Sequence, residues 1–204
     1  MDAYRFNLCY HQVGEGSILD VGAYLGDFLK LAQNDKREIF GTEINEKRVN
    51  LVNSVLEADV VKLDFRNGNL CQFEDSSVDN VVCMETVEHV IDDRHAISEL
   101  CRVARKRVII TVPFRENLQQ VLCMHCDQYT PHFGHQHSYD RGSFLNLIPS
   151  TWKVNLEKSF AKRLTRIAAQ LIPESRMMVP VLRVLDNIIP GDGKWVLIVL
   201  EKKD

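Results

Sequence analysis

The sequence contains no apolar run that approaches the length of a membrane-spanning helix. Residues 1–17, MDAYRFNLCYHQVGEGS, also lack the apolar core of a secretory signal. An excess of positive charge is missing as well, because 25 Lys and Arg are outweighed by 28 Asp and Glu, for a net charge of −3. Proteins that bind nucleic acid over a broad surface are usually basic. We therefore expect a cytoplasmic protein without a membrane span or a nucleic-acid footprint.

A disulfide framework is not indicated either. Four of the six cysteines, Cys9, Cys71, Cys83 and Cys101, are scattered, and the last two fall in segments with the pattern of a buried strand or helix. This usage is typical of reduced thiols in a cytosolic protein. There is no internal repeat, low-complexity tract or linker, so the 204 residues are expected to form a single domain.

Short apolar runs alternate with stretches of helical periodicity. The runs that predict strands cover residues 17–23, 38–44, 60–65, 78–87 and 107–114. Stretches of about ten to twelve residues with helical spacing separate them, and Asp92 or Asp93 can cap one of these helices. Strands and helices in alternation predict right-handed βαβ units and therefore a parallel sheet.

The chain after residue 114 departs from this alternation. Asp140 can cap a further helix, and residues 151–160 alternate like a strand. Residues 161–192 have helical spacing that is interrupted at Pro173, and residues 194–203 form a strong final strand pattern. This second part is expected to complete the sheet and to supply elements that cover it.

Residues suited to ligand binding follow the first four predicted strands. In a doubly wound sheet, ligands lie outside the carboxyl ends of the strands. The candidates at these positions are Asp20, Gly22, Ala23, Tyr24, Gly26, Glu43, Ile44, Asp64, Phe65, Met84 and Glu85. The two glycines let backbone approach a ligand closely, and the helix that begins there favours a carboxylate or phosphate. Glu43 can accept hydrogen bonds from a ribose diol, and Asp64 from an adenine amino group.

The order of the motifs along the first four predicted strands resembles that of class I S-adenosylmethionine-dependent methyltransferases. ILDVGAYLGDFL is similar to their glycine-rich motif, GTEINEKRV to their acidic strand-two motif and KLDF to their adenine-binding stretch. FEDSSVDNVVCMETVEHV resembles the strand-four motif of the small-molecule branch that includes the ubiquinone-biosynthesis type. The resemblance spans about residues 17–114. Tyr24 departs from it, because the family has a glycine there.

This resemblance implies a fold and an activity. The fold would be α/β, a Rossmann-like, doubly wound, mostly parallel seven-stranded sheet with an antiparallel last strand and helices on both faces. The cofactor would be S-adenosylmethionine, and an oxygen, nitrogen or carbon of a small-molecule acceptor would be methylated by in-line displacement. A cofactor-binding protein without turnover and a methyltransferase of macromolecules are the alternatives.

NAD is the competing cofactor for a glycine-rich turn after a first strand. It usually requires G-x-G-x-x-G, whereas this chain has only Gly22 and Gly26. Asp20 would repel a pyrophosphate at this position, while it would attract the ammonium group of a methionine. Electrostatics therefore favour the sulfonium cofactor.

Methyl transfer depends mainly on positioning, with proton removal second. Glu85 and His89 are the candidate catalytic residues; for His89 a structural hydrogen bond is the alternative, and many members of the resembled family use no dedicated base. The cofactor-binding core is expected over residues 17–114. A lid insertion (115–138) and a helical cap (161–192) are expected to build the substrate pocket.

The lid insertion contains CMHCDQYTPHFGHQH, residues 123–137. Cys123 and Cys126 have the spacing of a zinc knuckle, and His132 and His135 would complete a tetrahedral set. The loop between the two pairs is shorter than in most zinc modules. Zinc is therefore a candidate cofactor, and a polar lid without metal is the alternative.

Overall fold

The computed structural model describes residues 1–171 and 179–203, and within them a seven-stranded sheet has the order β3-β2-β1-β4-β5-β9-β8. The strands are β1 (Ile18–Val21), β2 (Ile39–Glu43), β3 (Asp59–Lys62), β4 (Val78–Met84), β5 (Ala104–Pro113), β8 (Trp152–Phe160) and β9 (Trp195–Lys202). The first five are parallel to one another, whereas β9 is antiparallel to both β5 and β8. The predicted fold class, including the antiparallel last strand, is confirmed.

The order of the strands creates one topological switch point. From β1 the chain builds outward through β2 and β3, and it then returns to place β4 on the other side of β1. Val21 pairs with Thr42 of β2 and with Cys83 of β4, so the residues after these three positions emerge side by side at one edge. Ligands of such sheets lie at this edge.

Helices cover both faces of the sheet. On one face lie α1 (Asp2–Tyr10), α2 (Leu29–Gln33) and α3 (Glu46–Val55), whose apolar side chains share a core with Ile18 and Ile109, and α6 (Val179–Ile188) adds Val179 and Leu182 to this core. On the other face, α4 (Asp93–Val103) contributes Ile97 and Leu100 to a core that also contains Leu19. Each such buried aliphatic side chain contributes about 2 kcal/mol to stability. Alternate residues of each strand thus serve two cores.

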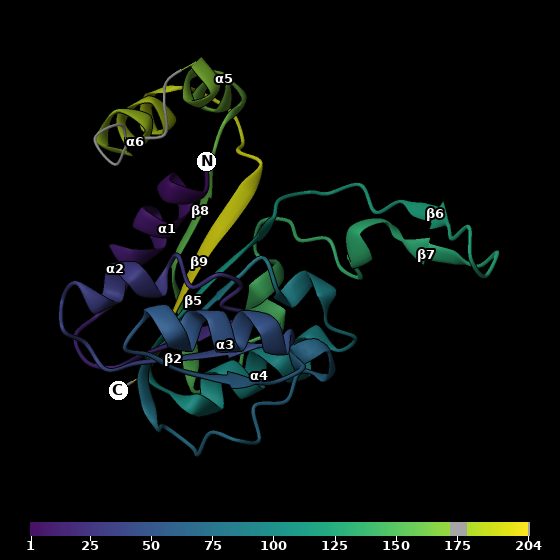
Figure 1. The fold of residues 1–204 in the computed structure, drawn as a ribbon. Coiled ribbons are helices and arrows are strands. Elements are labelled where there is room, and N and C mark those ends of the chain that lie inside the picture. The colour runs from purple at the N-terminus through teal and green to yellow at the C-terminus, as the bar shows by residue number, and fades with distance from the viewer. Residues whose placement is uncertain (172–178, 204) are drawn as a thin grey trace.

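Two peripheral parts extend from this body in Figure 1. The helices α5 (Arg163–Leu171) and α6 lie beyond the end of the sheet near α1, and the hairpin of β6 (Gln120–Leu122) and β7 (Tyr129–Pro131) projects away from it. The hairpin occupies the segment predicted as a lid insertion. Within the described residues, no helix has both the length and the apolar character needed to cross a membrane.

Some predicted helices are shorter or different in the structure. The helix after β1 is reduced to α2, because Tyr24 and Gly26 have φ of 50° and 72° and form a turn first. The chain after Asp140 makes a single 3-10 turn, η4 (Ser143–Asn146), and the Asp140 carboxylate instead accepts a hydrogen bond from Arg115. The cap of α4 is Asp92, one of the two predicted candidates. The predicted interruption at Pro173 lies outside the described residues.

Asp186 of α6 ties three elements together through a buried hydrogen-bond cluster. Its carboxylate is 1% exposed and accepts from the Tyr4 hydroxyl at 3.0 Å, the Thr165 hydroxyl at 2.7 Å and the backbone N–H groups of Ala161 and Lys162. We expect Asp186→Asn to lower the free energy of unfolding by about 2 kcal/mol, because an amide N–H would face these donors. Urea denaturation measures this change.

Tyr4→Phe is the matched control for this cluster. It removes one donor and leaves the carboxylate with three partners, so a loss of only about 1 kcal/mol is expected. An Asp186→Asn variant as stable as the wild type would contradict the assigned role of the carboxylate.

Candidate functional site

A cavity of about 710 Å³ lies at the carboxyl ends of β1, β2 and β4, at the switch point of the sheet. Every predicted ligand-binding residue lines it except Gly26. Gly26 shapes the turn from outside, because a Cβ there would lie 2.9 Å from Cγ1 of Val52 in α3. The sequence pattern therefore predicted the position of the cavity. Gly26, however, allows the turn to pack against α3 and does not line the cavity.

Gly22 lies where β1 and β4 separate. Its φ is 84°, a region that residues with a Cβ rarely adopt, and a Cβ would lie 2.5 Å from the Thr86 hydroxyl oxygen. That hydroxyl donates to the Met84 carbonyl, and the Gly22 N–H donates to the Thr42 carbonyl. Any side chain at residue 22 would therefore displace the floor of the cavity.

Asp20 presents a buried acceptor to the cavity. Its side chain is 2% exposed, and its Oδ1 has no hydrogen-bond partner within residues 1–171 and 179–203. Burial, partly offset by the charge of Arg5, raises the pKa of Asp20 to about 7. Buried acceptors are rarely left without a donor, so this carboxylate fits a ligand that carries an ammonium group.

Glu43 organises the adjoining turn. Its carboxylate, on a residue 4% exposed, accepts from the Tyr24 N–H at 3.1 Å, the Asn45 N–H at 2.9 Å and the Arg48 guanidinium at 3.3 Å. Arg48 also lies 4.3 Å from the centre of the Tyr24 ring. Tyr24 has a φ of 50°, which explains why glycine suits this position in the resembled family. A carboxylate has about four acceptor sites, so capacity remains for a ligand hydroxyl.

Asp64 differs from its predicted state. The Arg66 guanidinium and backbone N–H both donate to its carboxylate, with Nε at 2.9 Å from Oδ1, and these hydrogen bonds hold the pKa of Asp64 below its ordinary value. Phe65 is buried beneath the cavity wall, and Ile44 is exposed within it. This end of the cavity thus offers apolar surface for a ring, together with a carboxylate that is already paired.

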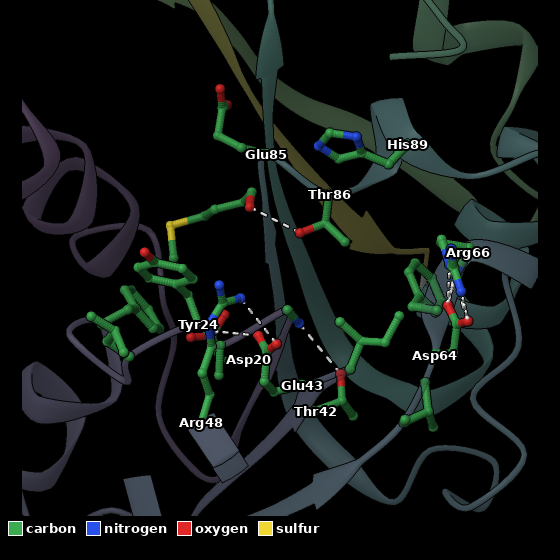
Figure 2. Close-up of a pocket in the computed structure, with 18 of the residues that line it drawn as sticks. Asp20, Tyr24, Thr42, Glu43, Arg48, Asp64, Arg66, Glu85, Thr86 and His89 are labelled. Atoms are coloured by element: carbon green, nitrogen blue, oxygen red, sulfur yellow. Dashed lines mark hydrogen bonds and ion pairs between the residues drawn. The ribbon is translucent and has the colours of Figure 1, made fainter. Parts of the chain in front are cut away.

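The two predicted catalytic residues occupy the other end. Figure 2 shows Glu85 and His89 on the Thr86 side of the cavity, away from Glu43 and Arg48. Glu85 has the unusual φ of 50° for a residue that is not glycine, a strain typical of functional positions. Burial raises the pKa of Glu85 against the opposing charge of Arg5, and burial lowers the pKa of His89.

Part of the wall at this end was not anticipated. Asp2, Arg5 and Phe6 of α1 line the cavity, and Arg5 forms an ion pair with Glu85 at 3.5 Å. The lid insertion contributes only Gly134 and Gln136, and no described residue of the predicted cap over residues 161–192 lines the cavity. The helical spacing of residues 2–10 does not indicate that Arg5 would line a ligand cavity. Arg48 and Arg66 follow Glu43 and Asp64 closely in the sequence, and this closeness is the only sequence feature that hints at their pairing with these carboxylates.

The structure does not bring the predicted zinc ligands together. Cys123 and Cys126 lie at the tip of the hairpin, where hydrogen bonds from the backbone of His125 and from Cys126 lower the pKa of Cys123. His135 lies at the base of the hairpin, with its ring centre 4.7 Å from that of His89. Zinc at the cysteine pair stays a prediction without support from this arrangement.

The comparisons with known proteins agree with this geometry. Residues 19–112 match a family model described as a methyltransferase domain. No curated protein sequence matches the chain. An S-adenosylmethionine-dependent methyltransferase from Mesorhizobium loti superposes with a TM-score of 0.68 at 13% identity, with 98% of each chain covered.

Two further solved structures share the fold. An S-adenosylmethionine-dependent methyltransferase from Archaeoglobus fulgidus has a TM-score of 0.64 at 20% identity, over 98% of this chain and 93% of that one. The [4+2]-cyclase SpnF has a TM-score of 0.68 at 15% identity, over 98% and 80%. Identities this low show the fold alone. Together with the domain match, they support a class I S-adenosylmethionine-dependent methyltransferase.

Proposed function

We propose that this protein transfers the methyl group of S-adenosylmethionine to an oxygen, nitrogen or carbon of a small molecule. The observation that carries this proposal is the buried Asp20 carboxylate, whose Oδ1 has no hydrogen-bond partner among the described residues, in a cavity that Glu43 also lines. An ammonium group would match the Asp20 carboxylate, and a ribose diol would match the Glu43 carboxylate. A pyrophosphate, by contrast, would be repelled by the Asp20 carboxylate in the lining of the cavity.

The chain's own residues position the reaction rather than drive it. S-adenosylmethionine supplies a methyl group that its sulfonium already activates for displacement. Gly22 allows backbone to approach the bound molecule, Ile44 and Phe65 offer apolar surface to its base, and Met84 and Glu85 border the methyl position. Holding an acceptor in line at that position provides most of the acceleration that such a reaction needs.

The end of the cavity beside Glu85 and His89 is the acceptor site in this proposal. It is bordered by α1 on one side and by Gly134 and Gln136 on the other, which suits a small molecule, and the strand-four motif resembles that of the ubiquinone-biosynthesis branch. Glu85 and His89 hold or deprotonate the acceptor. The proposal includes a cytoplasmic location.

Methylation of a macromolecule is the second candidate, and one surface favours it. The hairpin and its flanks expose large apolar side chains, namely those of Leu118, Val121, Leu122, Met124, Tyr129 and Phe133. Contiguous exposed apolar surface often marks an interaction site. The fold shared with a cyclase keeps a third candidate open, a cofactor-binding protein without methyl transfer.

Incubation with methyl-tritiated S-adenosylmethionine separates these candidates. The proposal predicts label in the low-molecular-mass fraction of a cell extract, and Glu85→Gln should reduce that transfer about tenfold or more. Label confined to protein or RNA supports the second candidate. Binding of the cofactor without any transfer supports the third.

The affinity for S-adenosylmethionine is expected to rise with pH. Because burial raises the pKa of Asp20 to about 7, an ammonium ligand must displace a proton below that pH, and the affinity should fall by up to about tenfold per unit. Calorimetry between about pH 5.5 and 7 measures this slope. Asp20→Asn should bind more weakly and lose the slope. An unchanged slope in that variant would assign the pH dependence to another group.

The same pKa shift affects stability with a definite sign. The folded chain holds the Asp20 proton to a higher pH than the unfolded chain, whose carboxyl has the ordinary value of 3.8. The contribution of this group to stability is therefore complete below about pH 4 and is lost as the pH rises towards 7. The ligand should offset this loss above pH 7.

A further inference from the structure

We propose that Glu88, His89 and His135 form a binding site for a first-row divalent metal ion at the acceptor end of the cavity. One carboxylate oxygen and one nitrogen from each imidazole all lie within 4.8 Å of one another. Ligand bonds of about 2.1 Å place neighbouring donors of one ion roughly 3 to 4 Å apart. Small side-chain rotations therefore bring these three groups into coordination distance.

Glu88 gives an independent reason to expect a cation. Its side chain is fully buried, and neither carboxylate oxygen has a hydrogen-bond partner in the described part of the chain. Arg5 forms its ion pairs with Asp2 at 3.0 Å and with Glu85 at 3.5 Å instead. A buried carboxyl group without partners is costly, because water has been removed and nothing replaces it. A metal ion bound between Glu88 and the two imidazoles would supply the missing interaction.

The surroundings of His135 are those of a metal ligand. Its Nδ1 is hydrogen-bonded to the Glu116 carboxylate, which orients the ring and leaves Nε2 free. Metal-binding histidines usually have such a carboxylate or carbonyl partner on the other ring nitrogen. The N–H of Gln136 donates to the Glu88 carbonyl at 2.7 Å, so backbone pairing holds the His135 segment against η2 (Val87–His89). The three ligands are thus arranged by the folded chain itself.

The donor set indicates the class of ion. Two imidazole nitrogens and one carboxylate oxygen suit Zn²⁺, Mn²⁺, Fe²⁺, Co²⁺ or Ni²⁺, whereas Mg²⁺ and Ca²⁺ prefer oxygen donors throughout. Three protein ligands leave at least one coordination position open. His89, Glu85 and Gln136 line the cavity, so the open position borders the acceptor site. This site shares only His135 with the predicted set that contains Cys123 and Cys126.

The open position also specifies the acceptor, in a step that rests on the proposed function. A hydroxyl oxygen bound to the ion would lose its proton to solvent at a lower pH than in water. That oxygen would form the bond to the methyl carbon while the carbon–sulfur bond breaks, and the sulfur would leave with the bonding electrons as a neutral thioether. The acceptor class is therefore an alcohol or phenol.

Titration calorimetry with Zn²⁺ and with Mn²⁺ tests the site, on full-length protein without a histidine tag after removal of chelator. We expect one equivalent to bind to the wild type, and His135→Ala and Glu88→Gln to weaken binding at least about 30-fold. His135 lies outside the two hydrophobic cores, so His135→Ala should fold and can test the metal site even if Glu88→Gln does not fold. Its thermal midpoint in chelator checks that it is folded.

His132→Ala and Cys126→Ser are the matched controls, because they alter the same segment without touching the three ligands. Both should bind like the wild type. Less than about one-tenth of an equivalent in the wild type, unchanged binding in His135→Ala, or loss only in Cys126→Ser would each overturn the proposal. S-adenosylmethionine binding, measured separately in chelator, distinguishes this failure from a failure of the proposed function.

Discussion

Gly22→Ala is expected to weaken S-adenosylmethionine binding by at least about 100-fold, which is about 2.7 kcal/mol. Its Cβ would lie 2.5 Å from the Thr86 hydroxyl oxygen, at a φ of 84°. The overlap can be relieved only if Thr86 or the turn after β1 moves, and both border the cavity. A ligand that fits the wild-type turn would therefore lose its backbone contacts. Calorimetry with the purified variant measures the loss.

Gly191→Ala is the matched control for backbone strain. Gly191 also has a positive φ, of 97°, but a Cβ there would meet nothing within 4 Å, and the residue does not line the cavity. We expect a loss of stability of about 1 kcal/mol with unchanged affinity. Equal affinity losses in both variants would show that strain alone, and not the shape of the turn, weakens binding.

Glu43→Gln is expected to weaken S-adenosylmethionine binding by about 100-fold. The carboxylate holds the N–H groups of Tyr24 and Asn45 and pairs with Arg48, while it also faces the place of a ribose. In the glutamine variant, the side-chain NH₂ group would face one of these donors instead of an acceptor oxygen. The Arg48 guanidinium would also lose the negative charge with which it pairs. Both effects disturb the acceptor that a diol needs.

The control for Glu43 is Glu46→Gln, three residues further along the chain. Glu46 is exposed and pairs with Lys62 at 3.0 Å, and exposed pairs of this kind contribute little. Its affinity for the cofactor should equal that of the wild type. A Kd for Glu43→Gln within about threefold of the wild-type value would remove Glu43 from the proposed ligand set.

The sheet and the position of its ligand edge were predictable, because both depend on local patterns. Apolar runs separated by helical spacing specify βαβ units, and in such units the residues after Val21, Glu43 and Met84 must meet at one edge. Asp20 and Gly22 could be assigned to the cavity on these grounds. Their burial and φ angle then follow from the close packing of β1 between β2 and β4.

What could not be predicted depends on contacts between distant segments. Arg66 binds the Asp64 carboxylate that was expected to accept from an adenine amino group. The sequence pattern does not reveal whether this carboxylate pairs with the nearby arginine or with a ligand. His135 was grouped with Cys123 because of spacing, yet the hairpin carries the cysteines outward and leaves the histidine beside His89. The zinc prediction treated closeness in sequence as closeness in space, and a hairpin of this length separates the two.

Direct titration of the protein with S-adenosylmethionine tests the central claim, that the cavity at the switch point holds this cofactor. The account predicts one site with a Kd below about 100 μM and a rise in thermal midpoint on binding, with NAD producing neither effect. Absence of both heat and thermal stabilisation at about 5 mM S-adenosylmethionine would contradict it, as would displacement of the cofactor by NAD.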